Sequence, residues 1–314
     1  MTVAIPAGVA PPRGSALASL MHRRRGLALF LLLLPPLLWF GTVYLASLIA
    51  LVLQSFFSVD DFTGALVREP TLATFRLLTS QPANLDIVLR TVAMALVVTL
   101  ASVVVAFPLA YYMARYARGR VRTLLTVAVI APMWTSYLVK VYAWRLILAK
   151  EGILSWFVGE LHLTAALERL LATPLVGGPS LASSYLGMAL VFLYMWLPFV
   201  ILPIEAALQR VPRNLIEASG DLGATPGQTF WHVILPLAVP GVAAGSVFAF
   251  SLTLGDYVIP QVVGAPGYFI GMMVYEQQGT AGNLPLAAAF SIVPMLLIVV
   301  YLALAKRAGA FDAL

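Results

Sequence analysis

Long apolar runs separated by short polar segments dominate this 314-residue chain. An α-helix needs about 20 mostly apolar residues to cross the hydrocarbon core of a bilayer. Six runs meet that length, at 27–53, 89–113, 124–144, 185–204, 237–258 and 285–305. The pattern predicts an all-α polytopic membrane protein, in which 27–305 form a single transmembrane domain of six helices.

The ends of the chain differ from these runs. Residues 1–26 contain Pro11-Pro12 and end in an arginine run, and we interpret them as a cytosolic tail. Residues 306–314 form a second, shorter tail. The run at 27–53 is longer than the apolar core of a signal peptide and no convincing cleavage site follows it, so it is predicted to be a retained span.

Three polar segments are predicted to lie outside, at 56–86, 145–182 and 259–284. In 145–182 apolar residues recur at helical spacing from Ile153 to Leu161, and Pro174 and Gly177-Gly178-Pro179 follow them. This spacing predicts one short helix on the outer membrane surface. The sequence leaves the roles of 57–87 and 145–182 open.

Composition and charge agree with a membrane protein. Hydrophobic residues make up 61% of the chain, charged residues 10%, and mean hydropathy is +0.95, which excludes a soluble globular domain. The predicted inner segments hold 12 of the 19 basic residues but four of the 13 acidic ones. This bias predicts that both termini are cytosolic and explains the net charge of +6 without nucleic acid as a partner.

Several kinds of chemistry are excluded by residue type. The chain has no cysteine, and His22, His162 and His232 lie far apart, so no metal site is predicted. A P-loop requires a lysine followed by serine or threonine, and none of the three lysines is so followed. A membrane-embedded enzyme would need clustered His, Asp or Glu at bilayer depth, and those present are isolated. The chain is therefore predicted not to be an enzyme, and any ATP hydrolysis requires another polypeptide.

The polar stretch 205–236 between the fourth and fifth runs is predicted to form two short helices, which we call the elbow. Pro212 suits the first helical position, because its missing N–H would be unpaired there. Leu215, Ala218 and Leu222 then fall on one helical face. Gly223 is expected to end the helix, since glycine tolerates a left-handed backbone.

The second half of the elbow has its own start signal. Thr225 with Gln228 three residues later fits a capping box, and Pro226 occupies the next helix's first position. Phe230 begins the apolar edge of this second helix.

These residues resemble a known signature. Glu217-Ala218-Ser219, Gly223 and Val233-x-Leu235-Pro236 resemble the EAA loop (EAA-x3-G-x9-I-x-L-P) of binding-protein-dependent ABC importer permeases, with Ser219 and Val233 as mild departures. The resemblance implies a type I importer permease fold whose elbow is a coupling helix in a cleft of the ATPase subunit. The alternative is an ordinary amphipathic loop of another membrane protein.

The resemblance also implies which elbow residues meet the ATPase. Glu217 would face a basic residue of that subunit, which would relieve its like-charge pairing with Asp221 four residues on. Gly223 would hold the turn. The predicted coupling residues are Leu215, Glu217, Ala218, Ser219, Leu222, Gly223 and Phe230.

A second resemblance, to the spermidine/putrescine subgroup, rests on Thr253-Leu254-Gly255-Asp256-Tyr257, the stretch 132–145 and Asp221 to Pro226. An intramembrane carboxylate is usually functional, and aromatic neighbours suit an ammonium group. The residues predicted to line the translocation pathway are Trp134, Tyr137, Asp256 and Tyr257. The alternative is a structural Asp256 that caps a broken helix or pairs with Lys140 or Arg145; Lys140 itself argues against a purely cation-attracting pore.

The resemblance implies a bacterial inner-membrane permease subunit. Its partners would be a second permease subunit, an ATPase homodimer that carries ATP and Mg²⁺, and an external solute-binding protein; this chain itself would bind no cofactor. A polyamine is the expected solute. Alternatives are an importer permease for another small solute, an ATP-independent secondary transporter, and a channel-like or scaffold subunit.

Overall fold

The computed structural model describes residues 25–60, 62–173 and 176–307. The predicted tail 1–26 therefore lies almost wholly outside the described residues, as do 308–314. By its internal contacts the chain forms two compact units, residues 1–53 and 54–314, and each is described by itself. The division into tails and a single domain over 27–305 stays a prediction.

The first unit is one apolar helical run. It comprises α2 (Arg25–Trp39), the π-helical turn η1 (Phe40–Leu45) and α3 (Ala46–Gln54). Residues 29–54 are long and apolar enough to be a candidate membrane span, although Pro35 and Pro36 lie inside α2. None of its most apolar stretch is buried within the structure. A helix that is apolar all round and unburied is suited to lipid or to another chain.

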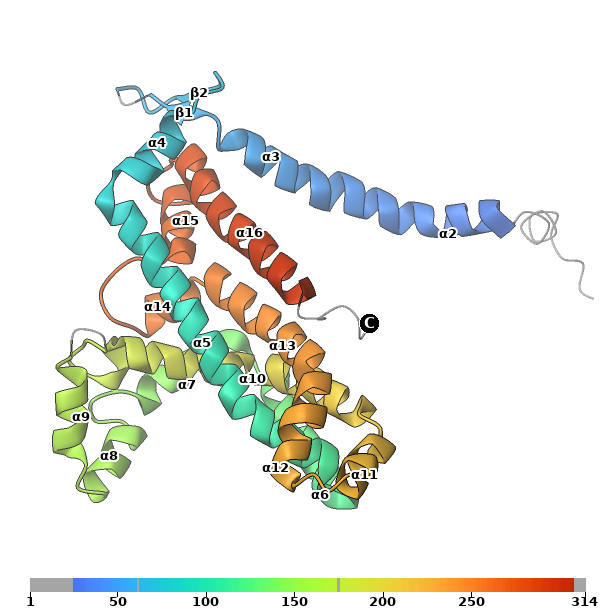
Figure 1. The fold of residues 1–314 in the computed structure, drawn as a ribbon. Coiled ribbons are helices and arrows are strands. Elements are labelled where there is room, and N and C mark those ends of the chain that lie inside the picture. The colour runs from blue at the N-terminus through green and yellow to red at the C-terminus, as the bar shows by residue number, and fades with distance from the viewer. Residues whose placement is uncertain (1–24, 61, 174–175, 308–314) are drawn as a thin grey trace, which may run out of the picture. The chain divides into compact units, whose positions relative to one another are not determined.

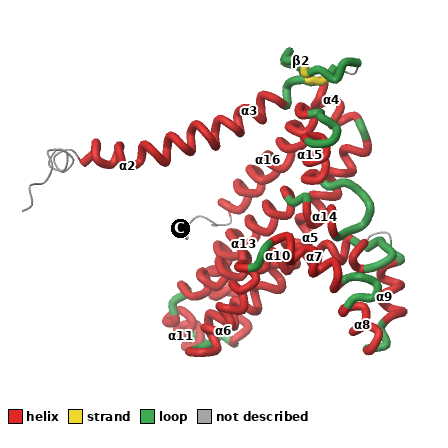
Figure 2. The backbone as a smooth tube through the Cα atoms, turned by 180° about the vertical axis from the view of Figure 1, so that it is seen from behind, coloured by secondary structure: helices red, strands yellow, loops and turns green. Residues whose placement is uncertain are grey.

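The second unit is almost entirely helical (Figures 1 and 2). It opens with β1 (Ser58–Val59), β2 (Leu66–Val67) and α4 (Ala73–Ser80). Its longer helices are α5 (Pro82–Arg115), α6 (Gly119–Ile130), α7 (Tyr137–Ile147), α10 (Tyr185–Arg210), α13 (Leu235–Gly255) and α16 (Leu284–Arg307). Shorter ones are η2 (Ala131–Trp134), α8 (Ile153–Glu160), α9 (Thr164–Leu171), η3 (Leu181–Ser183), α11 (Arg213–Asp221), α12 (Pro226–Thr229), η4 (Phe230–Ile234), α14 (Val258–Val262) and α15 (Ile270–Gln278).

Helix α10 is the centre of this unit. It packs against both α5 and α13, and 56% of its most apolar stretch is buried, compared with 33% for α5. Gly241 of α13 permits the close approach, because a Cβ there would lie 2.4 Å from the Ala207 Cβ and 2.7 Å from the Pro203 carbonyl oxygen. A Cβ at Gly245 would lie 3.0 Å from the Val200 carbonyl oxygen. These small residues therefore serve helix packing within the chain.

The predicted third span, 124–144, is wrong as a straight helix. Helix α6 with η2 and helix α7 meet at an angle of 100°. Pro132 lies in η2, and Thr135 and Ser136 adopt extended backbone conformations, so the helix cannot continue through them. The described residues therefore contain five helices long and apolar enough to cross a membrane, or six if this bent pair counts as one span. An all-α polytopic membrane protein is confirmed.

The segments predicted to be external carry more structure than expected. Residues 56–86 contain the antiparallel strand pair, in which Ser58 faces Val67, and helix α4. The turn between the strands is closed by Asp60, whose Oδ1 accepts hydrogen bonds from the backbone N–H groups of Phe62 and Thr63. These bonds lower the pKa of the Asp60 carboxyl.

The single helix predicted within 145–182 is incomplete. Helix α8 fits the expected spacing, but α9 follows it. His162 between them has a φ of 58°, which ends α8 and reverses the chain. Helix α9 is amphipathic, but it has only eight residues. Its apolar repeat therefore covers about two turns, which is too short to be recognised as a helix in the sequence. The segment 259–284 likewise contains α14 and α15.

Candidate functional site: the elbow and the Asp256 cluster

The first half of the elbow is helix α11, and it lies with α12 and the start of α6 at one end of the unit, opposite β1 and α4 (Figure 1). Pro212 was predicted as the first helical residue. It is instead the N-cap, with φ −65° and an extended ψ of 137°, so the helix begins one residue later at Arg213. Proline's fixed φ suits both positions, and ψ decides between them.

Gly223 ends α11 as predicted. Its φ of +81° lies in the left-handed region that glycine adopts without strain. The Gly223 N–H donates to the Gly220 carbonyl at 2.8 Å, and the Ala224 N–H donates to the Ser219 carbonyl at 3.0 Å. These bonds satisfy carbonyls that the helix end would leave unpaired.

The second half of the elbow begins as predicted but does not stay separate. Thr225 and Gln228 form a complete capping box, with Pro226 in the first turn. However, α12, η4 and α13 are continuous with one another. Together they form one helix, Pro226–Gly255, that is long and apolar enough to be a candidate membrane span. The helix that carries the predicted fifth span therefore begins at Pro226, upstream of Leu237. A π-helical turn precedes Pro236, where wider hydrogen bonding accommodates a residue without an N–H, so the helix continues.

Two contacts hold the elbow in shape. The hydroxyls of Ser219 and Thr229 lie 2.9 Å apart and join α11 to α12. The Phe230 ring packs edge-on against Phe107 and Tyr111 of α5, each at 5.8 Å between ring centroids. Phe230 was predicted to dock against the ATPase; the structure places its ring half-buried on α5, and Ser219 is likewise half-buried.

The rest of the elbow presents apolar side chains outward. Leu222 is 89% exposed, Leu215 44% and Trp231 64%. Glu217 and Ala218 are also exposed. We call Leu215, Leu222 and Trp231 the elbow patch. Trp231 was missed from the sequence, although its position beside Phe230 in the polar stretch was a usable signal. Large apolar side chains that are exposed at a chain reversal are suited to bind a partner.

The base of the elbow is fixed by charged groups that the sequence reasoning did not single out. Glu205 is buried near the end of α10, accepts a hydrogen bond from Gln209 at 2.7 Å and lies 3.6 Å from the Arg122 guanidinium. Arg115 at the end of α5 donates to the Val211 carbonyl at 3.1 Å. These contacts join α6 to α10, and α5 to Val211, which lies between α10 and Pro212, the N-cap of α11.

The second candidate site surrounds Asp256, which follows α13. The Tyr137 hydroxyl at the start of α7 donates to Asp256 Oδ2, and the Ile259 N–H donates to Oδ1 at 2.9 Å. The Tyr137 ring stacks on Trp196 of α10, with centroids 6.3 Å apart. Tyr137 and Asp256 were both predicted for the pathway and the fold brings them together across 119 residues.

The other two predicted pathway residues differ. Tyr257, the residue after Asp256, stacks on Tyr275 of α15, with centroids 4.9 Å apart. Trp134 is 78% exposed on η2. Trp196 and Tyr275 were missed, because only the tertiary fold shows that α10 and α15 meet this region.

Lys140, one of the two alternative partners predicted for Asp256, has a different hydrogen-bond partner. Lys140 Nζ donates to the Pro132 carbonyl at 2.9 Å. It thereby satisfies a carbonyl at the break between α6 and α7. Asp256 does take the capping role, since it accepts the Ile259 N–H at the start of α14. The structural and functional interpretations of this residue are therefore compatible.

A second carboxylate, Glu276, and a further tyrosine, Tyr268, line a neighbouring cavity of about 280 Å³ together with Tyr275. Its lining includes Gln261, Tyr268, Tyr275 and Glu276. The Tyr268 hydroxyl hydrogen bonds to Glu276, which raises the pKa of that tyrosine. Tyrosine rings around a carboxylate are the chemistry that binds ammonium groups.

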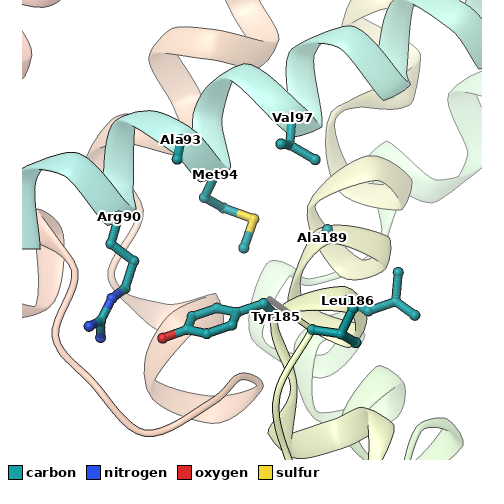
Figure 3. Close-up of a pocket in the computed structure, with 8 residues that line it drawn as sticks. Arg90, Ala93, Met94, Val97, Tyr185, Leu186 and Ala189 are labelled. Carbon is teal, nitrogen blue, oxygen red and sulfur yellow. The ribbon is translucent and has the colours of Figure 1, made fainter. Parts of the chain in front are cut away.

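A different cavity, of about 400 Å³, lies between α5 and α10 and is shown in Figure 3. Met94, Val97 and Leu186 make it apolar, and Arg90 is its one charged lining residue. The Arg90 guanidinium is ion-paired with Asp86 and lies 5.8 Å from the centre of the Tyr185 ring. With its cation already paired, this cavity offers little for a polar solute.

The fold and the elbow agree with a comparison against known families. A model described as "binding-protein-dependent transport system inner membrane component" matches residues 106–308. The chain belongs to this family, and it is the permease component of an ABC importer. It is thus a multi-pass membrane subunit that serves transport and is not an enzyme, as predicted.

Individual relatives place it more closely. The chain is 59% identical to the inner membrane ABC transporter permease protein YdcU of Escherichia coli (strain K12), over 92% of each chain. It is 29% identical to the spermidine/putrescine transport system permease protein PotB of the same organism, over 82% of this chain and 85% of the relative. Among solved structures, a bacterial alginate ABC transporter in complex with an alginate pentasaccharide-bound periplasmic protein aligns with a TM-score of 0.69 at 16% identity, covering 92% of this chain and 95% of the other.

Proposed function

We propose that the elbow is the element through which a separate ATPase drives this permease. The support is the elbow patch, because its apolar side chains are held outward by Gly223, the capping box and the Ser219–Thr229 contact. Glu217 lies exposed beside it and supplies a carboxylate for a basic residue of the ATPase.

In this proposal the chain forms half of a translocation pathway in the bacterial inner membrane. A second permease subunit forms the other half, an ATPase homodimer binds both elbows, and an external solute-binding protein delivers the solute. Both termini are cytosolic, on the side of the elbow, in agreement with the distribution of basic residues. Closure of the ATPase dimer draws the elbows together, and the spans rock to open the pathway outward.

We infer that the solute is a small organic cation of the polyamine class. The observation that carries this inference is the Asp256 cluster: a carboxylate that accepts a hydrogen bond from Tyr137, whose ring stacks on Trp196, and that is followed in the chain by Tyr257, whose ring stacks on Tyr275. Glu276 adds a second carboxylate among tyrosines in the same region. Such groups attract alkylammonium ions by charge and by cation–π interaction. The similarity to a spermidine/putrescine permease supports the same class.

The solute is tested with Asp256→Asn. Asparagine keeps the acceptor for the Tyr137 hydroxyl but removes the negative charge, so we expect uptake of labelled spermidine to fall at least about tenfold, as for the loss of a charge-assisted contact. Uptake is measured in vesicles that hold the assembled importer. Asp86→Asn, which removes an exposed charge elsewhere, serves as control. Unchanged spermidine uptake by Asp256→Asn would contradict the assignment of this carboxylate to the pathway.

The elbow patch is tested with Leu222→Asp. Leu222 is almost fully exposed, so the change leaves the folded chain intact, whereas burial of a leucine in an interface contributes about 1.5–3 kcal/mol. We expect the ATPase retained on the purified permease to fall at least tenfold. Leu72→Asp changes another exposed leucine, at the start of α4, and should retain the ATPase. Equal retention by both variants would show that the patch is not a docking surface.

A further inference from the structure

Arginines from separate parts of the chain converge on one cavity at the base of the elbow. The cavity has a volume of about 670 Å³ and lies where α5 and α10 end and α6 and α11 begin. Its charged lining residues are Arg115, Arg118, Arg122, Arg210, Arg213 and Glu217. Among the described residues, five guanidinium groups thus line this cavity together with a single carboxylate.

Among the described residues, one carboxylate lines the cavity, Glu217, and one lies close to a lining arginine, since Glu205 is 3.6 Å from Arg122. Arg115 is half-buried and donates to the Val211 carbonyl, while its Nε is buried and has no hydrogen-bond partner among the described residues. Several cations held around one cavity repel each other, and a multiply hydrogen-bonding anion between them removes that repulsion.

The geometry of guanidinium groups selects the kind of anion. Each presents a planar fork of N–H donors that matches two oxygens of a phosphate, and such bonds are stronger than neutral ones. Arg118, Arg122 and Arg213 are exposed and can turn toward a ligand in the cavity. A phosphate-bearing anion is therefore the chemical class that this cavity fits.

The position of the cavity indicates where the phosphate comes from. It lies at the end of the apolar helix α5, whose outward side chains include Leu100 and Val104. Tyr112 and Tyr116, both well exposed, occupy the last turn of the same helix and the residue after it. Tyrosines at the end of an apolar span mark the level of lipid headgroups, and basic pockets at this level bind anionic headgroups.

We propose that this cavity binds the phosphate headgroup of an anionic phospholipid from the leaflet on the elbow side of the membrane. The headgroup joins Arg115, the last residue of α5, and Arg118, the N-cap of α6, to Arg213, the first residue of α11. Anionic lipid thereby holds the elbow against the spans that it moves. Binding itself depends only on the cavity; its effect on coupling rests on the proposed function of the elbow.

Binding is tested on the purified full-length chain by native mass spectrometry after delipidation, with cardiolipin, phosphatidylglycerol or phosphatidylcholine added back. The test variant is Arg118→Gln/Arg213→Gln, and the matched control is Arg145→Gln/Arg169→Gln, which removes the same charge from exposed positions away from the cavity. We expect the test variant to bind the two anionic lipids at least tenfold more weakly and the control to stay within twofold of the unaltered chain. Arg118→Lys/Arg213→Lys keeps the charge and should retain part of the affinity.

Three results would overturn the proposal. Equal anionic-lipid affinity in the test and control variants would show that the arginines act only through overall charge. Displacement of the lipid by millimolar inorganic phosphate would indicate a site for free phosphate. Loss of the ATPase from Arg118→Gln/Arg213→Gln with unchanged lipid binding would assign the cavity to an acidic segment of that subunit. If lipid binds as expected but its removal does not change ATP-driven uptake, the effect of lipid on coupling is refuted and the lipid site stands; the coupling role of the elbow is tested separately by Leu222→Asp.

Discussion

Replacing Gly223 with proline should abolish uptake while the chain still inserts into the membrane. Proline fixes φ near −65°, whereas the backbone at Gly223 has a φ of +81°. Proline also lacks the N–H that donates to the Gly220 carbonyl at 2.8 Å. The reversal between α11 and α12 therefore cannot form, and the elbow patch loses its arrangement. We expect uptake below about one tenth of normal in vesicles that hold the assembled importer.

A graded series makes this result specific to the backbone. Alanine at 223 costs about 1–2 kcal/mol in the left-handed region, so Gly223→Ala should be partly active. Gly227→Ala is the control, since Gly227 has an ordinary φ and open space at its Cβ position. The amount of inserted chain should be equal in all three variants. Normal uptake by Gly223→Pro would mean that the shape of the elbow is not used in coupling.

The second large effect is expected at Gly241, in the packing of α13 on α10. A Cβ at this position would lie 2.4 Å from the Ala207 Cβ and 2.7 Å from the Pro203 carbonyl oxygen, both too close for any side chain. Gly241→Val should therefore force α13 away from the central helix. Overpacking of a core lowers the free energy of unfolding by about 1–3 kcal/mol. Because the added side chain would also clash with backbone, we expect a loss at the upper end of this range or larger. The measurement is the thermal unfolding midpoint and the monodisperse fraction in detergent.

Two further variants separate the clash from a general effect of valine. Gly159→Val in α8 meets open space and should leave the unfolding midpoint unchanged. Gly241→Ala combined with Ala207→Gly removes the side-chain contact but leaves the Pro203 carbonyl oxygen, so only partial recovery is expected. A Gly241→Val chain as stable as the unaltered protein would show that α10 and α13 pack differently.

Local signals in the sequence were sufficient for the elbow. The capping box of Thr225 and Gln228 and the left-handed Gly223 depend on residues within one turn, so their spacing determined them. At Pro236 the same reliance on local signals gave a wrong helix boundary. It was interpreted as a boundary between a short helix and the fifth span, but the π-helical turn before it lets the helix run through.

Features that depend on distant neighbours could not be predicted in this way. The break between α6 and α7 lies in an apolar run, where hydropathy alone cannot distinguish a straight helix from a bent one. Trp196 and Tyr275 join Tyr137, Asp256 and Tyr257 only because α7, α10, α14 and α15 meet in the fold. The sequence identified the carboxylate and two of its aromatic neighbours, and the structure supplied the other two rings.

The unbroken run from Pro226 to Gly255 has a mechanical consequence. Its 30 residues extend about 45 Å at 1.5 Å per residue, with the elbow turn at one tip and Asp256 immediately beyond the other. A tilt imposed on the first turn would be transmitted toward the opposite tip through one continuous helix, in which the π-helical turn and Pro240 are the points of bending. The carboxylate would then change its distance from Tyr137, which lies on a different helix, when this helix tilts against α10.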